Sequence, residues 1–67
     1  MTKKDVIKVK ATVVEPHSQE TVWVVLDNQH RVLARIDRYK HSARILPGDC
    51  VLVEMADKNR GWIVGRC

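Results

Sequence analysis

Apolar and polar residues alternate along most of the chain, with the apolar side chains two positions apart. In the first such stretch, residues 6–14, lysine and threonine alternate with Ile7, Val9, Ala11 and Val13. Successive side chains of a strand point to opposite faces, so this spacing predicts a β-strand with one buried face. Pro16 should break the strand, since proline cannot donate a hydrogen bond to a neighbour.

The same period predicts two more strands separated by a tight turn. The apolar positions of the second strand are Val22, Val24 and Leu26. Residues 27–30 should form the turn, because Asp and Asn side chains hydrogen-bond their own backbone. In the third strand, one face carries Val32, Ala34 and Ile36, and the other carries Arg31, Leu33 and Arg35.

The alternation is lost over residues 37–44 and then returns. Asp37 is a plausible helix N-cap, so this connector is predicted to form a short helix or turn. Pro47 and Gly48 predict a tight turn that starts a fourth strand near residues 49–55. A polar loop then leads to a last strand at residues 62–66.

Five short strands in 67 residues predict one all-β domain spanning residues 1–67. The simplest closure without exposed edges is a five-stranded barrel of the OB type, with the connector between strands three and four. An SH3-like barrel is the alternative.

The positive charge is concentrated in the second half of the chain. Residues 1–30 hold four lysines and four acidic residues, whereas residues 31–67 hold eight Lys or Arg against four acids, which gives the net +4. Six of those eight are arginines, whose planar guanidinium suits phosphate and stacks on bases. The balance indicates a nucleic-acid binder, with a solvated basic surface as the alternative.

Other features narrow the function. The chain has no apolar run of membrane-spanning length and no signal-peptide core, so we expect a soluble, cytoplasmic protein. We expect Cys50 and Cys67 to be free thiols and the three scattered histidines to bind no metal. No nucleophile motif or phosphate-binding glycine loop is present, which predicts a binding module without a cofactor rather than an enzyme.

Four segments of the sequence form a recognisable pattern: ATVVE, VVLDNQHRVLARI, RILPGDCVLVE and GWIVGR, at residues 11–15, 24–36, 44–54 and 61–66. They resemble bacterial translation initiation factor one, an S1-like OB-fold family. In the same order, that family reads G-x-V-x-E, V-x-L-x-N-G-H-x-V-x-A-x-I, R-I-x-x-G-D-x-V-x-V-E and G-R-I-x-x-R. The departures are Ala11, Gln29 and Trp62, together with shorter loops, including the basic connector. They are compatible with a divergent paralogue.

The resemblance implies a translation initiation factor that binds ribosomal RNA on the small ribosomal subunit as a monomer. Ribosomal protein and other initiation factors are further candidate partners. The candidate RNA-binding residues are Arg38, Tyr39, Lys40, His41 and Arg44 in and beside the connector, and Trp23, His30, Arg31, Arg35, Arg60 and Arg66 elsewhere.

Several roles stay open from the sequence. Trp23 could stack on bases or cover an open end of the barrel, and His30 could cap its turn or contact RNA. Outward-facing Val25 and Leu33 could instead contact protein. The alternative functions are therefore a general single-stranded RNA binder or RNA chaperone, and a protein-interaction module that has lost ribosome docking.

Overall fold

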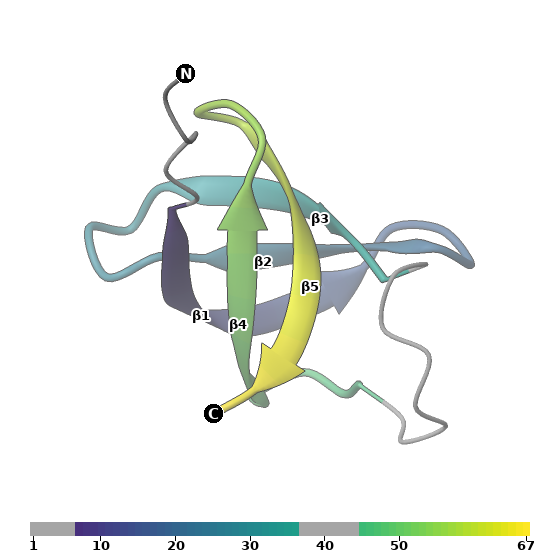
Figure 1. The fold of residues 1–67 in the computed structure, drawn as a ribbon. Helices are drawn as coiled ribbons and strands as arrows, with labels where there is room; N and C mark the ends of the chain where they lie inside the picture. Colours follow the sequence, from purple (N-terminus) through teal and green to yellow (C-terminus); the bar gives the residue numbers. More distant parts are fainter. Residues whose placement is uncertain (1–6, 37–44) are drawn as a thin grey trace.

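The computed structural model describes residues 7–36 and 45–67, which form a closed five-stranded barrel (Figure 1). The strands are β1 (Lys8–Pro16), β2 (Thr21–Val25), β3 (Arg31–Arg35), β4 (Cys50–Met55) and β5 (Arg60–Arg66), arranged around the barrel as β1-β2-β3-β5-β4. The predicted all-β OB-fold barrel is confirmed. The predicted short helix or turn between the third and fourth strands falls on residues 37–44, outside the described part of the chain.

Strand β1 is bent and pairs with two different neighbours. Its first half is antiparallel to β4, from Lys8 opposite Glu54 to Thr12 opposite Cys50. Its second half is antiparallel to β2, with a register shift between Val13 and Glu15. Such a bulge bends a strand and allows a sheet to turn a corner. The strand therefore continues to Pro16, whereas the sequence pattern predicted that it ends at residue 14.

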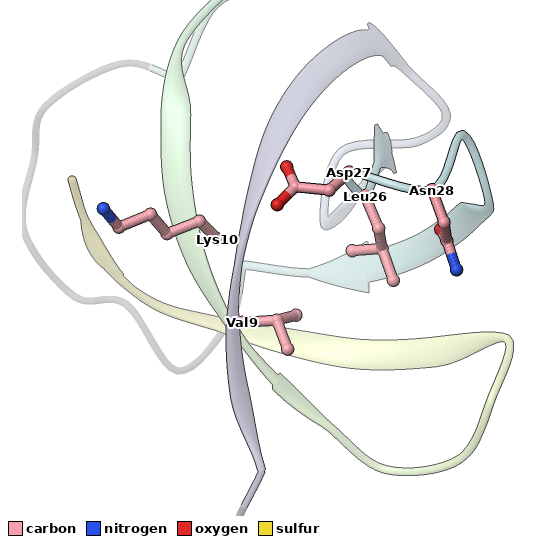
Figure 2. Close-up of a pocket in the computed structure, with 5 residues that line it drawn as sticks. All are labelled: Val9, Lys10, Leu26, Asp27 and Asn28. Atoms are coloured by element: carbon pink, nitrogen blue, oxygen red, sulfur yellow. The ribbon is translucent and has the colours of Figure 1, made fainter.

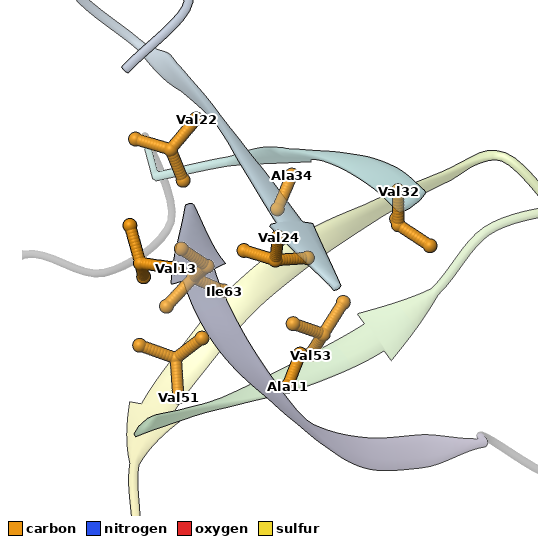
Figure 3. Close-up of a cluster of buried hydrophobic side chains, with 9 residues drawn as sticks. All are labelled: Ala11, Val13, Val22, Val24, Val32, Ala34, Val51, Val53 and Ile63. Carbon is orange, nitrogen blue, oxygen red and sulfur yellow. The ribbon is translucent and has the colours of Figure 1, made fainter. Parts of the chain in front are cut away.

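The core consists of small and β-branched side chains that point into the barrel (Figure 3). β-branched residues pack well on a pleated surface, which suits them to this interior. The buried residues of β1, β2 and β3 occupy the apolar positions of the predicted alternation. The nine buried hydrophobic residues are Ala11, Val13, Val22, Val24, Val32, Ala34, Val51, Val53 and Ile63.

The predicted Pro-Gly turn is present and is hydrogen-bonded to β1. Gly48 adopts φ 94°, a conformation that residues with a Cβ rarely adopt. Its N–H donates to the carbonyl oxygen of Val13 at 2.8 Å, and the Val13 N–H donates to the carbonyl oxygen of Asp49 at 2.9 Å. The turn is thereby held against β1 at the point where β4 begins.

The expectation of free thiols is wrong, because Cys50 and Cys67 form a disulfide with their Cα atoms 5.3 Å apart. The two residues are 17 positions apart in sequence. The antiparallel pairing of β4 with β5 places Val51 opposite Arg66 and so brings the cysteines together. The sequence alone does not reveal this pairing.

Over the described residues, the structure contains no helix long and apolar enough to cross a membrane.

Candidate nucleic-acid interface

The outer surface of β2, β3 and β5 combines cationic and aromatic side chains. We call it the basic face and define it by Trp23, Arg31, Leu33, Arg35, Arg60 and Trp62. Each of these residues has a buried residue as a neighbour in sequence. Because successive side chains of a strand point to opposite faces, all six point outward. Strand β3 lies in the middle, antiparallel to β2 and parallel to β5.

Trp23 occupies the β2 side of the basic face and is half-buried. Its ring meets the His17 ring edge-on, with centroids 5.8 Å apart and planes at 89°. The guanidinium carbon of Arg31 lies 5.9 Å from the Trp23 ring centroid, within the range of a cation–π interaction. Leu33 lies directly opposite Trp23 on β3. The indole is therefore held by its neighbours on the outer wall, with part of its surface accessible to solvent.

The arginines of this face differ in their ionic partners. Arg35 forms an exposed ion pair with Glu20, with 3.2 Å between guanidinium nitrogen and carboxylate oxygen. Arg31 and Arg60 have no carboxylate within ion-pair distance among residues 7–36 and 45–67. Exposed ion pairs contribute little to stability, on the order of 0–1 kcal/mol. A phosphate could therefore replace Glu20 beside Arg35 at small cost.

His30 joins two loops at one end of the barrel. Its Nε2 donates to the Lys58 carbonyl oxygen at 2.6 Å, which links the β2–β3 turn to the β4–β5 loop. Its backbone N–H donates to Asn28 Oδ1 at 3.0 Å. The imidazole therefore links the two loops, while the Asn28 side chain accepts the hydrogen bond within the turn.

Arg66 is a predicted site residue that does not lie on the basic face. Arg66 lies at the far end of β5 from Arg60 and pairs with Asp49 at 3.1 Å. The predicted connector residues lie outside the described residues: Arg38, Tyr39, Lys40, His41 and Arg44. The structure thus brings together Trp23, Arg31, Arg35 and Arg60, and separates Arg66 from them.

Trp62 is a residue of this face that the sequence analysis did not include among the site candidates. It lies opposite Arg35 across the parallel β3–β5 pairing and opposite Glu54 on β4. The alternation with buried Ile63 could have placed it on the outer surface. Its position beside Arg35 could not be predicted from the alternation, because a period of two does not show which strands pair or in what register.

A separate open groove of about 400 Å³ lies between β1 and the β2–β3 turn, and its lining is mainly apolar. Val9 and Leu26 contribute apolar surface, while Lys10 points to the other side of its strand (Figure 2). Asp27 and Asn28 complete the lining. No group of three or more His, Cys, Asp or Glu residues in the described ranges is arranged to hold a metal ion.

No protein-family model matches the chain. Among solved structures, the chain is similar to translation initiation factor one from the Wolbachia endosymbiont strain TRS of Brugia malayi. The two superpose with a TM-score of 0.74 at 28% sequence identity, over 96% of this chain and 80% of that one. The sequence blocks agree with this likeness. The chain therefore has an OB fold and is similar to translation initiation factor one in structure.

Proposed function

We propose that the protein binds ribosomal RNA on the small ribosomal subunit and assists the initiation of translation. The observation that carries the proposal is the likeness to a solved translation initiation factor one in both fold and sequence, which extends over 96% of the chain. The proposed role is that of a binding module without catalytic activity. It acts as a monomer by occupying a site and shaping the RNA there.

The basic face supports this function chemically. In OB folds, the surface of strands two and three is a common site for oligonucleotides. Here that surface carries Trp23 for stacking and Arg31 and Arg35 at phosphate-binding spacing, with Arg60 beside them on β5. Binding of this kind uses a cationic surface that follows the RNA backbone and aromatic rings on which bases stack.

The connector supplies the second part of the proposed interface. In sequence it lies between Ile36 and Ile45, so it follows the end of β3 that carries Arg35. Its basic and aromatic residues are Arg38, Tyr39, Lys40, His41 and Arg44. Because most of the affinity would come from phosphate contacts, binding should weaken steeply as the salt concentration rises.

The test is co-sedimentation of the protein with purified small ribosomal subunits across a salt series. We expect binding that fades with salt and that weakens in the double variant Arg38→Ala/Lys40→Ala. The slope of log affinity against log salt should become shallower by about 0.7 for each lost contact with single-stranded RNA.

The matched control is Lys8→Ala/Lys10→Ala, which removes the same charge from the outer side of β1. In the ring order, β1 is separated from β3 by β2 on one side and by β4 and β5 on the other, so these lysines lie outside the β2–β3 surface. The control should bind nearly as well as the wild type. An equal loss in both variants would mean that net charge alone drives the association.

Two outcomes would favour the alternative functions. A protein that stays in the supernatant at low salt but binds single-stranded RNA would be a general RNA binder. Subunit binding that resists salt and requires Val25 or Leu33 would indicate a protein contact through the outward apolar residues.

A further inference from the structure

Two tryptophans lie on the outer wall of the barrel, on the two strands that flank β3. Trp23 lies opposite Leu33, and Trp62 lies opposite Arg35. Leu33 and Arg35 are two residues apart and therefore point the same way. The path from Trp23 to Trp62 crosses two strand spacings and runs two residues along β3, from Leu33 to Arg35. The usual dimensions of a sheet then place the Cα atoms of the two tryptophans about 12 Å apart.

Arg31 and Arg35 lie beside the path that an RNA backbone would follow between the two rings. Arg35 is the direct neighbour of Trp62, and the Arg31 guanidinium lies over Trp23. Both rings are half-buried, so each is supported by the barrel wall and keeps part of its surface accessible. A cationic surface crossed by aromatic rings is the arrangement by which OB folds hold single strands without reading their sequence.

We propose that Trp23 and Trp62 form a two-base stacking site for single-stranded RNA, with Arg31 and Arg35 neutralising the phosphates between the bases. This inference rests on the proposed function and specifies the kind of RNA that the basic face holds. In the family pattern described above, the position of Trp62 is an arginine. The second stacking position is therefore a property of this chain and extends the interface from β2–β3 onto β5.

The test uses the two tryptophans as separate reporters. Each of the variants Trp23→Phe and Trp62→Phe leaves one indole, and the phenylalanine preserves an aromatic ring in the wall. Titration with a short oligouridylate should quench the fluorescence of the remaining indole in both variants. Trp23→Ala and Trp62→Ala should each weaken oligouridylate binding about 5- to 150-fold, the range for loss of one stacked base. The control Leu46→Ala, which trims an exposed apolar side chain in the turn before β4, should bind like the wild type.

Quenching of only one indole, or of neither, overturns the two-base site. Equal affinity of the wild type and Trp62→Ala overturns it as well. These results are distinct from failure of the proposed function, which is measured by sedimentation with ribosomal subunits. A protein that sediments with subunits while oligouridylate leaves both indoles unquenched retains the proposed function and lacks this site.

Discussion

Gln29 is the one non-glycine residue with a positive φ among residues 7–36 and 45–67, at 70°. It lies in the turn between β2 and β3, where its N–H donates to the Leu26 carbonyl oxygen at 2.9 Å. For a residue with a Cβ this left-handed conformation costs about 1–2 kcal/mol, whereas glycine adopts it freely. The family pattern has glycine at this position. In this chain the turn has the same left-handed backbone, but Gln29 stands in place of the glycine.

Gln29→Gly should therefore stabilise the protein by about 0.5–1 kcal/mol, because the relief of strain exceeds the extra entropy that glycine loses on folding. Urea unfolding monitored by circular dichroism measures the difference. Gln19→Gly is the matched control, since Gln19 is an exposed loop residue without positive φ. It should be neutral or destabilising, and a gain of the same size there would show that backbone strain at Gln29 is not the cause.

Gly61 is required on β5 because there is no space for a side chain. A Cβ at this position would lie 2.7 Å from Val53 Cγ1 and 2.8 Å from the Glu54 carbonyl oxygen. The second of these atoms belongs to the backbone of β4 and can move only with its strand. We expect Gly61→Ala to destabilise the protein by about 1–3 kcal/mol, the usual cost of overpacking.

Gly65→Ala is the control for this prediction in the same strand, since an added Cβ there meets only Leu52 Cβ at 4.0 Å. Thermal unfolding should show a clear loss for the Gly61 variant and little change for the Gly65 variant. Similar losses at both positions would mean that glycine in β5 matters for reasons other than the contact with β4.

At the scale of the elements, the inward residues of each strand could be predicted from the alternation alone. Val22 and Val24 on β2, and Val32 and Ala34 on β3, are buried as expected. The ends of β1 were less predictable. The bulge between Val13 and Glu15 changes the register, and a period of two contains no sign of such a shift.

Which strands become neighbours was also beyond the sequence pattern. The parallel contact of β3 with β5 joins segments separated by the connector and by β4. This contact places Trp62 beside Arg35, and the pairing of β4 with β5 likewise brings Cys50 to Cys67. The spacing of Arg31 and Arg35 could be predicted because both lie on one strand. The approach of Trp62 could not, because predicting it requires knowing which strands pair.

The turn that starts β4 depends on the carboxylate of Asp49. One of its oxygens, Oδ2, accepts the Leu46 N–H at 2.9 Å and also pairs with the Arg66 guanidinium at 3.1 Å. Asp49→Ala should cost about 1–2 kcal/mol, since it removes both the turn hydrogen bond and the ion pair.

Asp49→Asn separates these two contributions. The amide oxygen can still accept the Leu46 N–H, while the charge opposite Arg66 is lost, so we expect a loss below about 1 kcal/mol. Chemical unfolding of both variants measures the difference. If the asparagine variant is as unstable as the alanine variant, the ion pair with Arg66, and not the hydrogen bond from Leu46, stabilises the turn before β4.

For the whole molecule, stability depends on closing a very small barrel. The core is made of valine, alanine and one isoleucine, and domains of this size gain little from hydrophobic burial. The strand pair β4–β5 is closed at its end by the disulfide, where the Cys67 N–H also donates to the Cys50 carbonyl oxygen at 3.1 Å. The cross-link therefore joins the last strand to the barrel at the end that carries Arg66.

The disulfide should supply a large part of the stability of the oxidised protein. A cross-link between residues 17 apart reduces the entropy of the unfolded chain, and a loop of about this length is worth roughly 3 kcal/mol. We therefore expect dithiothreitol to lower the melting temperature by about 10–20 °C. The double variant Cys50→Ser/Cys67→Ser should melt at the lower temperature with or without dithiothreitol, which separates loss of the bond from other effects of the reductant. Because reducing compartments keep such pairs as thiols, the reduced form must still fold if the protein works there. An unchanged melting temperature on complete reduction would mean that the β4–β5 pairing closes this end of the barrel without the covalent bond.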